Sequence, residues 1–358
     1  TGCYFKGAIS NAAQVTSSDK TNPYLIIGGI AGHVNGSEGG NVATISNCET
    51  TADHAEVASA HASLSAIIVN KTTVAYHSAV GGIVGELGNG VVSSCTNDAT
   101  IGNSIFRGAD ATGRYIKSGG IVGRNAAEGV ITGCTNNGSV THRSNPRNQC
   151  LGGIAGKAEG VSSSIENCDN TVDAGVSNSA QVYLYPTDAA TGSHSNHYIG
   201  GIVGLTEATD PVKNCINGGE VRITAGNSTS PITGIKMGGI IGKMTGSGEV
   251  YNADNNGLVR METFQAVEGG HSGNDLGGII GYITSESSVT VTLCDNAGGV
   301  RIGCGNGLVQ DCIVSGVVGR MDAPGSITSC KNGGAIAMNI TKNDVGPRDL
   351  YTAGILGK

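Results

Sequence analysis

One internal repeat of about 38 residues dominates this sequence and limits the folds that the chain can adopt. Its anchor is a glycine followed by isoleucine or valine, usually within the pentapeptide G-G-I-V-G, as at 81–85. A repeat of this length is typical of solenoids and propellers, in which each unit buries its apolar face against its neighbours. The nine anchor glycines are Gly29, Gly82, Gly120, Gly153, Gly201, Gly239, Gly278, Gly316 and Gly354.

A second block, with the consensus [VI]-x-x-C-x-N-x-G-x-[VI], follows each of the first eight anchors. The chain opens inside such a block at Cys3 and closes at Lys358, just after an anchor. We therefore expect it to be a segment of a longer array. The cysteine position is occupied by Cys48, Cys95, Cys134, Cys168, Cys215, Cys294 and Cys330, with Ala253 in the remaining unit.

Both blocks are short apolar runs bounded by Gly, Asn and Ser, which is a strand signal. The chain contains 60 glycines and no tryptophan, so neither helices nor a core of large aromatic rings is expected. Equivalent strands can instead stack as parallel ladders about 4.8 Å apart. The sequence thus predicts an all-β fold, a parallel β-helix or β-solenoid of about nine repeats that forms a single domain over residues 1–358.

Stacking also explains the residue types of the repeat. We expect Ile30, Ile83, Ile121 and their equivalents to form an internal aliphatic ladder, and the recurrent Asn to bond from coil to coil. Val92 and Cys95, three residues apart, would face opposite sides of a regular strand, so a bend between them is required if both point inward. A β-propeller is disfavoured, because a blade needs four strands and the unit shows only two or three strand signals.

The recurrent cysteines are expected to be small buried hydrophobes, since Ala253 replaces one of them. No C-x-x-C pair suggests a metal site. Cys304 and Cys312 lie outside the repeat position and could form a disulfide, which geometry rather than spacing decides.

The net charge of −7, with no basic run, argues against a nucleic-acid partner. No apolar stretch is long enough to span a bilayer. The chain starts at Thr1 without a signal peptide, which is compatible with a mature exported piece. We expect a monomeric solenoid without a cofactor.

The two blocks together resemble the GLUG-type repeats of bacterial cell-surface proteins, which include immunoglobulin-A-protease-like proteins and adhesins. The resemblance covers nearly the whole chain and implies an exported, surface-located β-helical stalk. The protease activity of such proteins belongs to a separate zinc-peptidase domain with the motif H-E-x-x-H. This motif is absent here, since His54 is followed by Ala55 and Glu56, so no proteolysis is expected.

Candidate binding residues lie in the two longest intervals, near 50–79 and 171–198, because insertions in a solenoid form loops that often bind ligands. Tyr also recurs shortly before the anchors and could form a sugar-binding stripe or cover the edge of the coil. His194 and His197 could ligate a metal, but four ligands close a structural zinc site and no further ligand is obvious, so no metal is expected. The candidates are Tyr76, His77, Tyr183, Tyr185, Asp188, His194, His197 and Tyr198.

Because stacking accounts for most of the regularity, we expect a non-catalytic surface or secreted scaffold without catalytic residues. It would act as a stalk or as an adhesin for a host glycoprotein or a polysaccharide. The alternative is a polysaccharide lyase or glycoside hydrolase, by analogy with other β-helices. A face with clustered Asp, Arg or Lys would favour this enzyme, whereas a smooth column with protruding loops would favour the scaffold.

Overall fold

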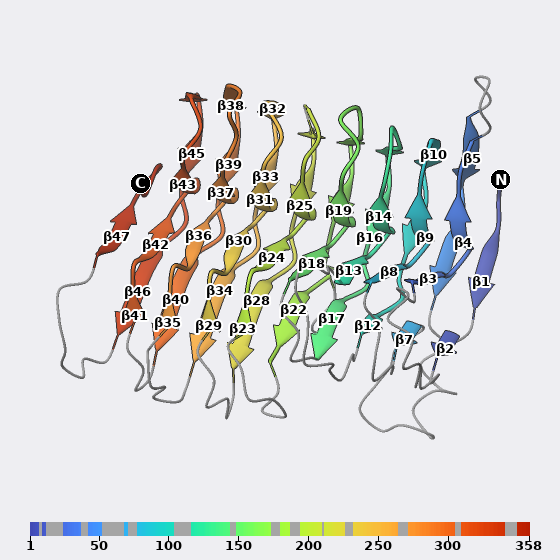
Figure 1. Cartoon of the computed structure of the whole chain (residues 1–358), viewed down its shortest axis with the longest axis horizontal. Helices are drawn as coiled ribbons and strands as arrows, with labels where there is room; N and C mark the ends of the chain where they lie inside the picture. Colours follow the sequence, from blue (N-terminus) through green and yellow to red (C-terminus); the bar gives the residue numbers. More distant parts are fainter. Residues whose placement is uncertain are drawn as a thin grey trace.

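The computed structural model is an all-β solenoid with no helix among the residues that it describes. Its strands stack along the longest axis of the molecule, and the two ends of the chain lie at opposite ends of the stack (Figure 1). The structure describes residues 1–6, 9–11, 24–36, 42–51, 68–70, 77–103, 116–143, 148–172, 180–186, 194–209, 211–225, 232–263, 271–304, 309–340 and 349–358.

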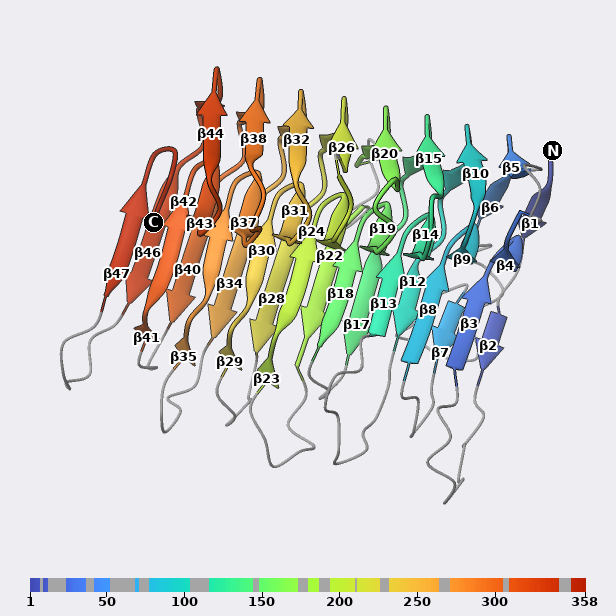
Figure 2. The same cartoon turned by 45° about the horizontal axis from the view of Figure 1, so that its top comes forward.

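One repeat forms one coil, as the segment 77–103 illustrates. It contains β8 (His77–Gly81), β9 (Val84–Leu87), β10 (Gly90–Ser93), β11 (Thr96–Asn97) and β12 (Ile101–Asn103). Each of these strands pairs in parallel with the equivalent strands of the neighbouring coils (Figure 2). The predicted parallel β-helix is confirmed, whereas the estimate of two or three strands per repeat was too low.

The five strands of a coil generate five long sheets, which we number I to V along the coil. Sheet I contains β3 (Tyr24–Gly28), β8, β13 (Ile116–Gly119), β18 (Gln149–Gly152), β24 (His197–Gly200), β30 (Lys236–Gly238), β36 (Asp275–Gly277), β42 (Cys312–Ser315) and β47 (Leu350–Ala353). Sheet II contains β4 (Ala31–Val34), β9, β14 (Val122–Asn125), β19 (Ala155–Ala158), β25 (Val203–Thr206), β31 (Ile241–Met244), β37 (Ile280–Ile283) and β43 (Val318–Met321). Sheet III contains β5 (Ala43–Ser46), β10, β15 (Val130–Thr132), β20 (Ser164–Glu166), β26 (Val212–Lys213), β32 (Gly248–Tyr251), β38 (Val289–Thr292) and β44 (Gly325–Thr328).

Two further sheets and a shorter one complete the coil. Sheet IV contains β1 (Tyr4–Lys6), β6 (Glu49–Thr51), β11, β16 (Thr135–Asn136), β21 (Asp169–Asn170), β27 (Ile216–Asn217), β33 (Asp254–Asn255), β39 (Asp295–Asn296) and β45 (Lys331–Asn332). Sheet V contains β2 (Ile9–Asn11), β7 (Ile68–Asn70), β12, β17 (Val140–Arg143), β22 (Val182–Tyr185), β28 (Val221–Ala225), β34 (Val259–Thr263), β40 (Val300–Cys304) and β46 (Ile336–Ile340). Sheet VI contains β23 (His194–Ser195), β29 (Ile232–Thr233), β35 (His271–Ser272) and β41 (Val309–Gln310).

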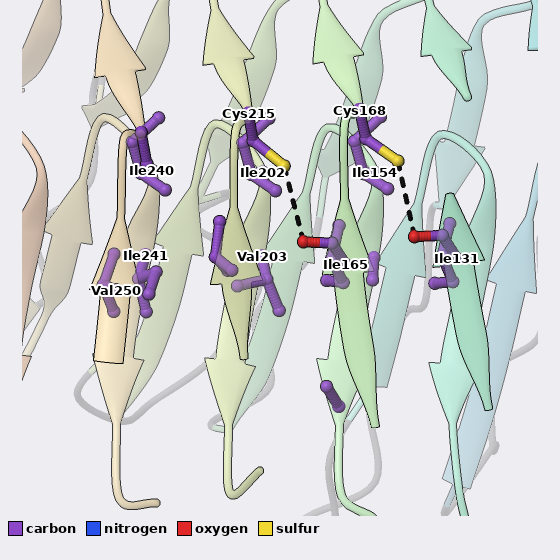
Figure 3. Close-up of a cluster of buried hydrophobic side chains, with 14 of the residues drawn as sticks. Ile131, Ile154, Ile165, Cys168, Ile202, Val203, Cys215, Ile240, Ile241 and Val250 are labelled. Atoms are coloured by element: carbon purple, nitrogen blue, oxygen red, sulfur yellow. Dashed lines mark hydrogen bonds between the residues drawn. The ribbon is translucent and has the colours of Figure 1, made fainter. Parts of the chain in front are cut away.

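The interior is divided into an aliphatic column between sheets II and III and a second one lined by sheets I, V and VI. The predicted isoleucine ladder belongs to the first column. Ile83 and Ile121 are fully buried, whereas Ile30 is partly buried against the same core. Figure 3 shows Ile154, Ile202 and Ile240 at equivalent places in three coils, beside Val203, Ile241 and Val250.

A continuous ladder of asparagine amides runs through the interior along sheet IV. Asn136 Nδ2 donates to Asn170 Oδ1 at 2.8 Å in the next coil and to Gly138 O at 2.7 Å in its own coil. Equivalent inter-coil bonds extend from Asn97 to Asn332. At the first coil, Thr50 Oγ1 donates to Asn97 Oδ1 at 2.6 Å. The predicted coil-to-coil bonding of the recurrent Asn is confirmed.

The anchor glycine is required because the asparagine ladder packs directly against it. A Cβ atom on Gly239 would collide with Gly278 O and with Asn255 Cγ. The anchors therefore serve a close backbone approach rather than a left-handed conformation. The glycine anchor and the cysteine–asparagine block of each repeat thus contact each other between the two aliphatic columns.

The required bend between sheets III and IV is a single residue in the left-handed region. It directly precedes the cysteine position, as with Ser94 (φ 52°) before Cys95 and Gly133 (φ 60°) before Cys134. Because this residue interrupts the alternation of the strand, both Val92 and Cys95 are fully buried.

Most of the recurrent cysteines are buried, as predicted for small hydrophobes, whereas Cys330 near the C-terminal end is partly buried and Cys3 at the N-terminal end is exposed. Cys168 Sγ donates to Ile131 O at 3.6 Å and Cys215 Sγ to Ile165 O at 3.5 Å, each across to the preceding coil (Figure 3). Cys134 is a free thiol whose pKa is raised to about 12, mainly by its hydrogen bond with Cys168 and by burial. Cys312 keeps its thiol, whose Sγ donates to Gln310 O at 3.2 Å, so the disulfide that Cys304 and Cys312 could form is not present in the structure.

Candidate functional site

The structure places the candidate residues of the interval 171–198 mainly on strands of the coil. Tyr183 and Tyr185 belong to β22 of sheet V, and His197 and Tyr198 belong to β24 of sheet I. His194 lies on β23 and His77 begins β8, but their side chains are outside the described part. Tyr76 and Asp188 also lie outside the described residues.

Tyr183 and Tyr185 point away from the core because β22 alternates strictly. Val182 and Leu184 are fully buried in the column lined by sheets I, V and VI, whereas the two tyrosines are half-exposed. Their ring centroids lie 6.1 Å apart in an edge-to-face arrangement. The pair therefore forms an aromatic patch on the outer face of sheet V.

Three arginines continue this outer face in the next three coils. Tyr183 pairs in register with Arg222, Arg222 with Arg260, and Arg260 with Arg301. The Arg222 guanidinium lies 5.2 Å from the centroid of the Tyr183 ring, a cation–π distance. We call Tyr183, Tyr185, Arg222, Arg260 and Arg301 the Tyr–Arg row.

Two glutamates hold the guanidinium groups of the row in place. Glu262 lies 3.4 Å from Arg222 Nη2, 3.1 Å from Arg260 Nη1 and 3.0 Å from Arg301 Nη2. Glu220 forms a further ion pair with Arg260. Among these five side chains, three guanidinium groups against two carboxylates leave one excess positive charge.

A second charged surface forms where the outer side chains of sheets I and II contact one another, and we call it the I–II face. Towards the N-terminal end it is a chain of ion pairs. Arg124 bridges Glu86, at 3.0 Å, and Glu159, and Lys157 bridges Glu159 at 3.0 Å and Glu207 at 2.9 Å. Burial opposes ionisation of Glu159, but its hydrogen bond from Arg124 and the nearby lysines lower the pKa of this carboxyl overall.

Further along, the I–II face carries a group of cations around Tyr282. Lys236 Nζ lies 5.0 Å and Lys243 Nζ 5.5 Å from the ring centroid of Tyr282, and the Arg320 guanidinium lies at 5.2 Å. Lys236 also pairs with the buried Asp275 at 2.6 Å. Burial lowers the pKa of Lys243 and raises that of Asp275.

Tyr198 lies on the I–II face, where Lys243 Nζ is 5.2 Å from its ring centroid. Along sheet I, the residues in register with Tyr198 are Cys150 in the preceding coil and Lys236 and Asp275 in the next two coils, and none of these is a tyrosine. The recurrent tyrosines that the structure describes on sheet I therefore do not form a continuous stripe.

His197 is fully buried, and strand alternation turns it to the side opposite Tyr198, towards the core. In the described part of the chain, no three His, Cys, Asp or Glu side chains gather in a way that could hold a metal ion. The same part contains no helix that could cross a bilayer.

The arginines of the row are the main functional candidates that sequence reasoning missed. Their signal is a repeat position, because each follows the valine that begins the sheet V strand, as in Val221-Arg222-Ile223 and Val259-Arg260-Met261. Aligning the repeats beyond the glycine of the second block would have revealed it.

Comparison with known proteins identifies no relative of this chain: no family model, no curated protein and no solved structure matches it. The resemblance to GLUG-type repeats stays a prediction.

Proposed function

We propose that this chain is a non-catalytic solenoid scaffold that binds a carbohydrate polymer through the Tyr–Arg row. The proposal rests on one observation. The outward-facing pair Tyr183 and Tyr185 lies on the same sheet face as three arginines that follow Tyr183 in register. Aromatic rings offer large, rigid contact surfaces, and guanidinium groups donate several directed hydrogen bonds. The resemblance to surface repeats adds export to a bacterial surface, with a polysaccharide or host glycoprotein as the partner.

Binding without turnover fits the chemistry of the row. Arginine keeps its proton at all physiological pH values, so it cannot serve as a general base. Glu220 and Glu262 each form ion pairs with guanidinium groups of the row, so both carboxylates are occupied by arginines. The row can therefore hold a ligand but lacks a matched acid and base.

A glycan array combined with a polymer-degradation screen tests this proposal. We expect retention of at least one polysaccharide with no shortening of its chain. Tyr183→Leu should weaken retention about tenfold, whereas Tyr251→Leu on sheet III should not change it. Turnover of any polymer, or retention that is insensitive to Tyr183, would contradict the proposal.

The I–II face supports the carbohydrate-active enzyme as a second candidate, because it clusters lysines, arginines and carboxylates as that alternative required. Lys243 has a lowered pKa, as a base in β-elimination would need, and the cations Lys236 and Arg320 lie nearby. Polymer cleavage that is lost in Lys243→Met would establish this function in place of the scaffold.

A further inference from the structure

We infer that the Tyr–Arg row recognises an acidic polysaccharide, a polymer with carboxylate or sulfate groups on its sugars, lying along the solenoid axis. The inference rests on the proposed carbohydrate-binding function and names the ligand class for the same face.

The charge of the row favours an anionic ligand. Arg222, Arg260 and Arg301 outnumber Glu220 and Glu262 in a chain whose overall charge is −7. Arg301 and Arg222 are the more accessible, with 40% and 26% of their side chains exposed, against 17% for Arg260. The outer two arginines are therefore the groups that reach a ligand.

The arrangement is also prepared for binding before a ligand arrives. Glu262 contacts all three guanidinium groups, and Arg222 Nε donates to Thr224 Oγ1 at 2.5 Å. Each guanidinium has five N–H donors, so donors remain for a carboxylate or sulfate after these bonds are made. Because the arginines are already held in place, binding costs less side-chain entropy.

The spacing of the row distinguishes a polysaccharide from an acidic peptide. Adjacent parallel strands lie about 4.8 Å apart, so Arg222 and Arg301, two coils apart, are separated by about 9.6 Å, which is close to the length of two sugars in an extended polymer. Side chains on one side of an extended peptide repeat about every 6.8 Å, twice the rise per residue. Successive sugars thus stay in step with successive coils, whereas successive acidic side chains of a peptide do not.

The test measures binding of the chain to polygalacturonate, alginate and chondroitin sulfate, and to methyl-esterified polygalacturonate and desulfated chondroitin. Polyglutamate serves as an acidic polymer with peptide spacing. We expect at least one acidic polysaccharide to bind at low salt, its neutralised form to bind at least tenfold more weakly, and affinity to fall as salt rises.

The variants Arg222→Gln and Arg301→Gln should each lower the affinity for that polymer about tenfold, the effect of one charge-assisted hydrogen bond. Lys331→Gln is the control, because Lys331 is an exposed cation paired with Asp295 but lies on sheet IV, outside both the Tyr–Arg row and the I–II face. Circular dichroism and urea unfolding establish that the variants remain folded. Unchanged affinity in both row variants would overturn the inference.

The remaining outcomes distinguish failure of the acidic-ligand inference from failure of the proposed carbohydrate-binding function. Equal binding of the neutralised polymers, with loss in Tyr183→Leu, would overturn the acidic ligand and leave carbohydrate binding in place. Tighter binding of polyglutamate than of any acidic polysaccharide would overturn the ligand class. If no polysaccharide binds, the proposed function fails together with the inference.

Discussion

At Leu293 the backbone has a conformation that its side chain disfavours. The φ angle is 55°, in the left-handed region, and the equivalent residue is Asn, Ser or Gly at the eight other repeats of this position. Leucine has no polar group to bond locally, and the left-handed conformation costs it about 1–2 kcal/mol. The fold tolerates this one position because the bend is imposed by the coils on either side.

Replacing Leu293 with Asn should therefore stabilise the chain by about 1 kcal/mol. The new amide would also lie beside Asn252, whose Nδ2 already donates to Asn214 Oδ1 at 3.0 Å. Urea unfolding measures the change. The reciprocal variant Asn252→Leu should have the opposite sign, and equal stability of both variants would show that the bend imposes no strain.

His142 is a buried titratable residue in the second aliphatic column. Neither of its ring nitrogens has a hydrogen-bond partner among the described residues, and burial lowers its pKa to about 3. In the unfolded chain its pKa is about 6.5. Between these values the unfolded chain binds a proton that the folded chain does not, so stability is lost as pH falls below about 6.5.

His142→Leu should raise stability at neutral pH and reduce the loss between pH 7.5 and pH 5 by about 2 kcal/mol. Leucine suits the site because Leu184, its partner in the next coil, is fully buried. His142→Gln separates the two effects, since it removes the titration but keeps a polar group. An unchanged pH dependence of unfolding in both variants would refute the assigned role.

At the scale of elements, the asparagine ladder links two motifs that are distant within each repeat. Its amides bond along the axis and also pack against the anchor glycines, which lie between sheets I and II. Each buried amide has both a donor and an acceptor satisfied, so the loss of one residue leaves polar partners unpaired in two coils.

Asn255→Ala should consequently destabilise the chain by about 3 kcal/mol. It removes the bond from Asn217 Nδ2 and those to Gly257 O and Asn296 Oδ1, each 2.8 Å long. Asn256→Ala, at the exposed neighbouring position, is the matched control and should change stability little. Thermal and urea unfolding compare the two, and a similar small effect of both would contradict a structural role for the ladder.

At the scale of the whole molecule, the solenoid is a one-dimensional stack in which each coil contacts mainly its neighbours. Such a stack tolerates the loss of a complete unit, since the flanking coils can close up in the same register. It does not tolerate loss of half a unit, which puts every following strand on the wrong sheet.

Deletion of residues 239–277 should therefore yield a folded, shorter solenoid, because Gly238 would then precede Gly278 and recreate the G-G anchor. Deletion of residues 239–257 should abolish cooperative folding of the C-terminal coils. Far-ultraviolet circular dichroism and limited proteolysis report both outcomes. Equal damage by the two deletions would argue against independent stacking of the coils.

The sequence by itself determined the repeat length, the parallel solenoid, the inward Ile, Val and Cys positions, and the coil-to-coil bonding of Asn. These follow from local patterns that recur, because stacking identical units places identical residues beside one another. Tyr183, Tyr185 and Tyr198 were selected as candidates because they lie in a long interval.

Only the tertiary structure decided that Tyr183 and Tyr185 share a face with Arg222, Arg260 and Arg301, while Tyr198 lies on the I–II face. It also brought each anchor glycine against an asparagine of the second block. Such neighbours are separated by part of a coil or by whole coils, so their contact depends on register and on the path of the coil, which no local pattern contains.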